Sequence, residues 1–179
     1  MSNLKLPRAT LITPLGSIRI CVDVRSAPIT AANFLAYVDG GHLDGTSFYR
    51  IVRSDNQPAD TAAKIEVVQF GYPMRGRVYS GPFPCIPHEA TSVTGLSHRD
   101  GTISMARMKP GTAGSGFFIC IGDQLELDFG GRRQPDGLGF AAFGQVEQGM
   151  DVVRAILSKA EPTQLLSNAI PLLRAERAQ

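Results

Sequence analysis

Cysteine and histidine are scarce in this sequence, with three residues of each. Cys21, Cys85 and Cys120 are odd in number and have no paired spacing, so nothing indicates a disulfide framework. Cys21 and Cys120 lie in apolar runs, which is typical of small core residues rather than reactive thiols. The three histidines are scattered along the chain, and we therefore expect no metal site.

Long apolar runs and a strong charge bias are also missing. The apolar runs fall far short of the roughly 20 residues that a membrane span needs, so no membrane partner is expected. A net charge of +2 without a basic stripe gives no case for binding nucleic acid. Residues 4–8 hold no apolar core of a signal peptide. A cytoplasmic location is the default expectation, and a periplasmic or secreted one applies if the sequence is trimmed.

What remains is the composition of one folded domain covering residues 1–179, with 43% hydrophobic and 19% charged residues. Short β-rich runs dominate, and the irregular stretches 53–64, 72–97 and 129–137 separate several of them. Thr30 suits the N-cap of a helix that ends at Gly40-Gly41, and residues 150–159 predict a second helix. A closing strand is expected over 170–175. The pattern predicts a barrel of short strands with capped ends.

The rest of the chain is organised around residues 101–123, which predict a strand, a glycine-rich turn and a second strand. Phe118 and Cys120 fall on one face of the second strand, and Phe117, Ile119 and Ile121 on the other. Such a strand is either buried on both sides in a sandwich, or it packs a core with one face and lines a groove with the other. Residues 111–116 lack the lysine of a phosphate loop and the spacing of a nucleophile elbow.

Residues 101–123, together with 48–52, 67–71 and 143–153, resemble the cyclophilin family of peptidyl-prolyl isomerases. The four motifs occur in the family's order, and the resemblance runs from about residue 9 to about residue 156. It implies a mostly β fold, a closed eight-stranded antiparallel β-barrel capped by two α-helices. It implies an enzyme that accelerates Xaa-Pro isomerisation in protein folding. Its partners would be proline-containing peptides and unfolded or partly folded proteins, and we expect a monomer without a cofactor.

The resemblance assigns the site residue by residue. Arg50 matches the arginine that hydrogen-bonds the prolyl nitrogen as the amide twists, and Gln69 matches the glutamine that orients it. Three apolar residues match positions that grip the proline ring: Val67, Phe118 and Leu127. Ala106 and Arg107 match positions that bind the extended peptide through their backbone. Phe140 matches a position at the rim of the groove.

Five positions depart from the family pattern, and all surround the matched site. Tyr49 replaces a histidine, which we interpret as a packing change, and Phe70 replaces a glycine. Glu66 falls where a phenylalanine commonly walls the proline pocket. Gly116 replaces a glutamine and Glu126 a tryptophan at the groove rim, so weak binding of the cyclic peptide cyclosporin is expected.

These departures leave three functions open. The first is a peptidyl-prolyl isomerase, and the second is a proline-binding module that keeps the groove but catalyses poorly. The third is a scaffold whose loops 53–64 and 129–139 recruit a partner. Retention of Arg50, Gln69 and Phe118 together favours the enzyme.

Overall fold

The structure, a computed structural model, describes residues 5–75, 78–79 and 81–179, and within them eleven short strands are the main regular elements. The strands are β1 (Arg8–Thr13), β2 (Gly16–Val22), β3 (Ser47–Val52), β4 (Val67–Gly71), β5 (Met74–Arg75), β6 (Val78–Tyr79), β7 (Thr102–Met105), β8 (Gly116–Cys120), β9 (Ala142–Gln148), β10 (Leu165–Pro171) and β11 (Arg174–Ala178). The helices are α1 (Pro28–Asp39), α2 (Thr91–Thr94) and α3 (Met150–Leu157), with 3-10 turns over Ser54–Asn56 and Leu125–Leu127. The expectation of a chain dominated by short strands is thus confirmed, except at the closing strand expected over 170–175.

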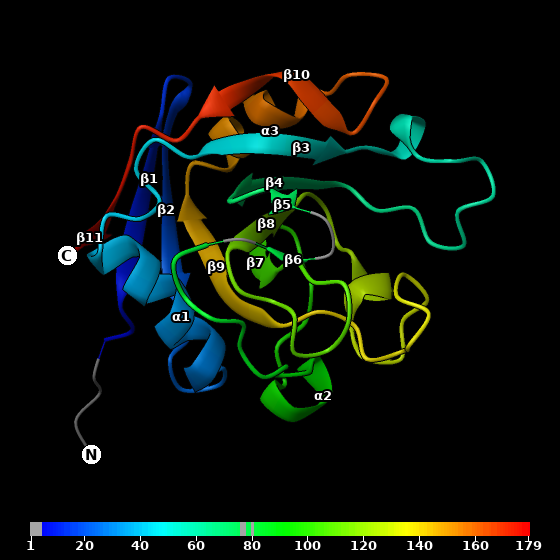
Figure 1. The fold of residues 1–179 in the computed structure, drawn as a ribbon, viewed down its shortest axis with the longest axis horizontal. Coiled ribbons are helices and arrows are strands. Elements are labelled where there is room, and N and C mark those ends of the chain that lie inside the picture. The colour runs from blue at the N-terminus through cyan, green and yellow to red at the C-terminus, as the bar shows by residue number, and fades with distance from the viewer. Residues whose placement is uncertain (1–4, 76–77, 80) are drawn as a thin grey trace.

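Nine of the strands form one curled antiparallel sheet in the order β10-β3-β4-β8-β7-β9-β2-β1-β11 (Figure 1). The expectation of a closed eight-stranded barrel is therefore wrong in strand number and in closure. The difference lies at residues 170–175, which do not form one closing strand. Leu172 and Leu173 donate their backbone N–H groups to Thr46 O and Ile12 O. The chain before them pairs with β3, and the chain after them pairs with β1.

Strand β8 separates two apolar clusters, because successive side chains point to opposite faces. Phe117 and Ile119 lie in the main core inside the curled sheet, where the ring of Phe117 is 5.3 Å from that of Phe34 in α1. Phe118 and Cys120 lie in a second cluster on the other face. This confirms the interpretation in which β8 packs the core with one face and is available to line a groove with the other.

Helices α1 and α3 pack into the main core from different sides of the curled sheet (Figure 1). Helix α1 begins at Pro28, whose missing N–H and fixed φ suit a first turn, with Ala27 at the cap position. Thr30 is therefore not the N-cap, and its hydroxyl donates instead to Glu89 at 2.6 Å. Gly41, at φ +65°, lies just past the helix end as expected. Within the described part of the chain, no helix is long and apolar enough to cross a membrane.

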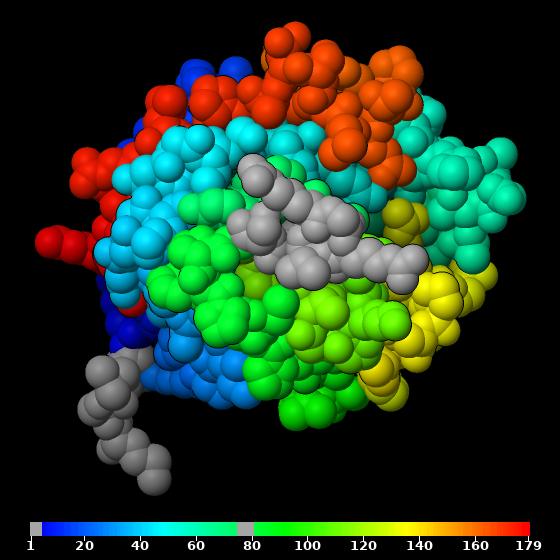
Figure 2. Space-filling view, viewed as in Figure 1, coloured from blue at the N-terminus to red at the C-terminus, as the bar shows by residue number. Residues whose placement is uncertain are grey.

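Two loops far apart in the sequence meet at one end of the molecule. Residues 53–64 follow β3, and residues 129–139 follow the second 3-10 turn. Figure 2 shows them side by side at the right, the first in teal and the second in yellow. A hydrogen bond of 2.8 Å from Arg133 to Gln57 joins them. This end of the molecule lies beside the open face of β3 and β4 (Figure 1).

Candidate active site

The pairing of β3, β4, β8 and β7 sets four side chains in one row across the sheet. Arg50 is opposite Gln69, Gln69 is opposite Phe118, and Phe118 is opposite Ser104. Directly opposed residues of antiparallel strands share a face. The register therefore brings a cation, an amide, an aromatic ring and a hydroxyl together on the side of the sheet away from the main core.

A groove of about 780 Å³ opens over this row. Its lining includes all eight residues that the sequence assigned to the site: Arg50, Val67, Gln69, Ala106, Arg107, Phe118, Leu127 and Phe140. Val67, Phe118 and Leu127 form an apolar floor, and each is at least 96% buried. The structure thus brings the predicted residues together, while their individual roles remain predictions.

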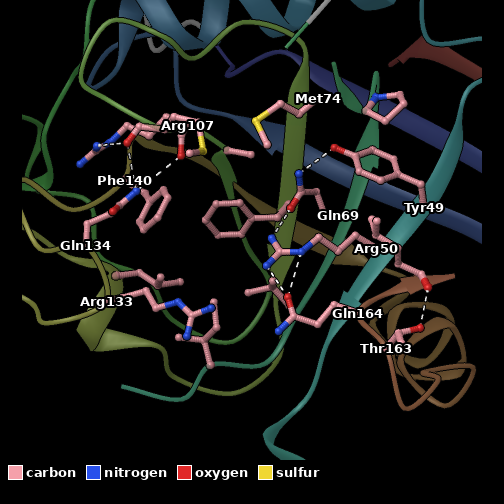
Figure 3. Close-up of a pocket in the computed structure, with 18 residues that line it drawn as sticks. Tyr49, Arg50, Gln69, Met74, Arg107, Arg133, Gln134, Phe140, Thr163 and Gln164 are labelled. Atoms are coloured by element: carbon pink, nitrogen blue, oxygen red, sulfur yellow. Dashed lines mark hydrogen bonds between the residues drawn. The ribbon is translucent and has the colours of Figure 1, made fainter. Parts of the chain in front are cut away.

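Arg50 is held along two edges of its guanidinium (Figure 3). Its Nη1 donates to Gln69 Oε1 at 2.9 Å, and its Nε and Nη2 donate to Gln164 Oε1 at 3.1 and 2.5 Å. Gln69 in turn donates from Nε2 to the hydroxyl of Tyr49 at 2.7 Å. Tyr49 is therefore more than a packing change, because its hydroxyl accepts a hydrogen bond from the amide nitrogen of Gln69, whose oxygen accepts from Arg50.

Phe118 rests on a buried polar network. Its ring stacks on that of His98, with centroids 6.1 Å apart, and meets Phe140 edge-on at 5.6 Å. His98 Nδ1 lies 2.6 Å from Asp128 Oδ1, and its Nε2 lies 2.9 Å from Ser104 Oγ. Serine, histidine and aspartate in this order suggest a hydrolase triad, but His98 and Ser104 are fully buried. The network therefore supports the floor and is not placed to attack a substrate.

Charge on Asp128 is favoured by this network. Burial raises the pKa of Asp128, but hydrogen bonds from His98 and Ser97 outweigh it and hold the pKa below its usual range. The carboxylate accepts from the Ser97 hydroxyl at 2.5 Å and from the His98 backbone N–H at 2.9 Å.

The side chain of Arg107 turns away from the groove centre. It donates to Asp136 at 2.7 and 3.0 Å and to Gly139 O at 2.8 Å, and its guanidinium carbon lies 5.3 Å from the centroid of Phe140. Its hydrogen bonds lower the pKa of Asp136. With its side chain held in this way, Arg107 can offer a peptide its backbone, which is the contribution that the resemblance implies.

Four of the five departures lie outside the groove lining, which includes Tyr49 but not Glu66, Phe70, Gly116 or Glu126. Glu66 accepts a hydrogen bond from the Ser54 N–H at 3.3 Å, and Ile65 lines the groove instead. Glu126 pairs with the exposed Arg132 at 2.8 Å. At this point of the groove the lining residue is therefore the apolar Ile65, and the carboxylates of Glu66 and Glu126 lie outside the lining.

Gln164 and Arg133 are among the lining residues that the sequence did not assign to the site. Gln164 is 114 residues from Arg50, and Arg133 lies in a loop of charged and glycine residues. Neither position carries a local pattern of spacing or hydropathy that points to the groove. Only the pairing of β10 with β3 and the meeting of the two loops bring them there.

An anchored guanidinium beside an apolar pocket, on the outer face of a curled antiparallel sheet, is the arrangement that the resemblance to cyclophilin-type isomerases implied. The model of the cyclophilin-type peptidyl-prolyl cis-trans isomerase family matches residues 8–176. The chain therefore belongs to this family and is a peptidyl-prolyl cis-trans isomerase.

Named relatives agree with this assignment. Peptidyl-prolyl cis-trans isomerase cyp18 of Streptomyces antibioticus is 37% identical over 147 residues, which cover 82% of this chain and 80% of the relative. Peptidyl-prolyl cis-trans isomerase B of Escherichia coli is 31% identical over 163 residues, covering 90% of this chain and 91% of the relative. A cyclophilin structure from Cryptosporidium parvum shares the fold, with a TM-score of 0.75 at 20% identity, covering 97% of this chain and 98% of that one.

Proposed function

We propose that this chain isomerises Xaa-Pro bonds in unfolded and partly folded proteins by presenting Arg50 to a twisted prolyl amide. The observation that carries the proposal is the double anchoring of Arg50 by Gln69 and Gln164 beside an apolar floor. An arginine fixed in this way does not have to give up side-chain freedom when substrate binds.

The reaction itself explains why such a site suffices. Amide resonance sets a barrier of about 18–20 kcal/mol to rotation about the C–N bond. Rotation removes the resonance and leaves a lone pair on a pyramidal nitrogen, which can accept a hydrogen bond. A guanidinium donor at that position stabilises the twisted amide more than the planar one, and this difference is what accelerates the reaction. The forked donors of Arg50 can also hold the carbonyl of the proline.

Substrate would enter as an extended peptide. In this proposal the proline ring packs on Val67, Phe118 and Leu127, and the residues before it run along the backbone of Ala106 and Arg107. Ala106 and Arg107 follow directly on β7, so a peptide there would extend the sheet, which is a common mode of peptide recognition.

The alternative of a module that binds proline but catalyses poorly has less support. Its case was built on Glu66, Gly116 and Glu126. Glu66 does not line the groove, and the carboxylate of Glu126 forms an ion pair with Arg132. The anchored Arg50, which a module that only binds would not need, favours catalysis.

The test is exchange NMR on a short Ala-Pro peptide, which reports binding and isomerisation separately. Arg50→Ala should lower kcat/KM by about 10²–10³, the effect of losing one preorganised donor. Arg50→Lys should recover little, because one ammonium cannot reach two acceptors at once. Wild-type kcat/KM in Arg50→Ala would show that the catalytic role is assigned wrongly. Binding without exchange in the unaltered protein would favour the binding module.

A further inference from the structure

Arg133 closes one end of the groove by joining two loops. Its Nη1 donates to Gln57 Oε1 at 2.8 Å and to Ala63 O at 3.0 Å, both in the loop that follows β3. Its side chain also lines the groove (Figure 3). The guanidinium of Arg133 is therefore half-buried beside the proline pocket, and the two partners of its Nη1 are both neutral.

The charge of Arg133 is not compensated by the protein. Arg107 pairs with Asp136 and Arg132 pairs with Glu126, so the other two arginines nearby each have a carboxylate. No ion pair forms at Arg133 within the residues that the structure describes. Burial, and after it the charge of Arg50, lowers the pKa of Arg133. Three arginines, counting Arg107, thus line the cavity, and the charges of Arg50 and Arg133 repel each other.

From this arrangement we propose that Arg133 forms a subsite for a carboxylate on the C-terminal side of the substrate proline. The carboxylate is either the side chain of an acidic residue that follows the proline or the chain end of a terminal proline. An anion there would relieve the repulsion between Arg50 and Arg133. This inference rests on the proposed function, because it uses the same pocket for the proline.

The position of Arg133 fixes the side of the proline on which the anion binds. Figure 3 shows Arg133 at the opposite side of the groove from Arg107 and Met74. A peptide whose leading residues run along Ala106 and Arg107, and whose prolyl carbonyl reaches Arg50, leaves the groove toward Arg133. Glu126 lies on this side as well, but its pairing with Arg132 limits its repulsion of an acidic ligand.

The experiment compares N-acetylated, amidated peptides that differ in one residue, Ala-Ala-Pro-Glu and Ala-Ala-Pro-Gln, by exchange NMR at low salt. The unaltered protein should isomerise the Glu peptide with about five- to tenfold higher kcat/KM, an effect of the size of a partly buried charge pair. The preference should shrink as salt rises, because screening weakens partly exposed pairs. A second pair, Ala-Ala-Pro with a free or an amidated end, distinguishes a terminal carboxylate from an acidic side chain.

Three variants make the test specific. Arg133→Gln should bring the ratio of kcat/KM for the Glu peptide over the Gln peptide to about one, and because both peptides are turned over by the same variant, this ratio is independent of any general change in the groove. Arg133→Lys keeps the charge and should keep most of the preference. Arg154 lies on α3 and pairs with Asp100, outside the groove. Arg154→Gln removes one positive charge there and should leave kcat/KM for both peptides unchanged.

Outcomes against the inference differ from outcomes against the proposed function. Equal turnover of the Glu and Gln peptides by the unaltered protein would overturn the carboxylate subsite and leave the isomerase intact. A preference that persists in Arg133→Gln would overturn its assignment to Arg133. Turnover of neither peptide would overturn the proposed function, and the subsite with it.

Discussion

One oxygen of Gln164 accepts two hydrogen bonds from Arg50, although the two residues are 114 positions apart in the chain. Gln164 directly precedes β10, and the pairing of β10 with β3 brings it beside the guanidinium. Its amide also donates to Asn56 O at 3.4 Å. The residue that precedes β10 therefore contributes to the site by holding the edge of Arg50 that Gln69 does not contact.

Gln164→Ala should lower kcat by about tenfold and change KM little. The substitution removes hydrogen bonds to a charged group, each in a class that is typically worth about 1.5–3 kcal/mol, but it removes no contact to the proline ring. Single-turnover and steady-state kinetics on an Ala-Pro peptide separate the two parameters. Asn168→Ala, at an exposed position of the same strand, is the matched control and should behave as the unaltered protein. A fall in kcat of equal size in both variants would point to general loosening of β10 instead.

Phe118→Leu should lower kcat/KM by about tenfold, or about 1.4 kcal/mol, because the flat ring face under the proline is lost. Its cost in the free energy of unfolding should stay below about 1.5 kcal/mol, since most of the volume remains. Phe117→Leu is the control from the opposite face of β8: it lies in the main core, so it should cost stability with kcat/KM per folded molecule unchanged. Equal losses of activity in the two variants would remove the distinction between the two faces.

Much of the fold and of the site was predictable because the signals are local. The alternation of Phe117, Phe118 and Ile119 on β8 predicted two faces, and the structure has both. The resemblance placed eight residues in the site, and all eight line one groove.

The errors arose where long-range pairing decides the structure. Residues 170–175 have the composition of one strand, but each half pairs with a different neighbour, which also opens the predicted barrel. Thr30 is a good cap by type, yet Pro28 starts the helix and Glu89, 59 residues away, takes the Thr30 hydroxyl. Gln164 and Arg133 reach the groove through long-range contacts that no local pattern in the sequence predicts.

The three cysteines should react with a thiol reagent in a fixed order. Cys85 is exposed and should react first. Burial, and after it the charge of Glu147, raises the pKa of Cys21, so Cys21 should react more slowly. Cys120 is buried, and desolvation raises its pKa far above the usual range, so it should react only after unfolding. Cys85→Ser should abolish the fast phase, and a fast phase that survives this substitution would contradict the order.

Stability should fall in acid partly through Asp128. Its pKa in the folded protein lies below that of the unfolded chain, about 3.9, so its stabilising effect is full above that pH. The effect is lost as the pH falls through the lower, folded-state pKa. Urea unfolding between pH 2.5 and 7 should therefore show a shallower acid slope for Asp128→Asn than for the unaltered protein. Asp60→Asn, at an exposed position, is the control, and an unchanged slope in Asp128→Asn would rule out this contribution.

Cyclosporin should inhibit this enzyme weakly, because position 126 offers it no indole and position 116 offers it no side-chain amide. Glu126 stands where sensitive family members present an indole, and its charge is held by Arg132 at 2.8 Å. Burying that pair against an apolar ligand is costly. Gly116 has no side-chain amide to hydrogen-bond the backbone of the drug.

The two losses together should cost about 2–4 kcal/mol, which is roughly 30- to 1000-fold in affinity relative to a sensitive member. Glu126→Trp should recover a measurable part of the affinity in a titration calorimeter. Arg132→Gln is the companion variant: it leaves Glu126 without its partner and should not improve binding, since the missing ring is not restored. Nanomolar inhibition of the unaltered protein would show that this rim binds the drug by contacts other than these two.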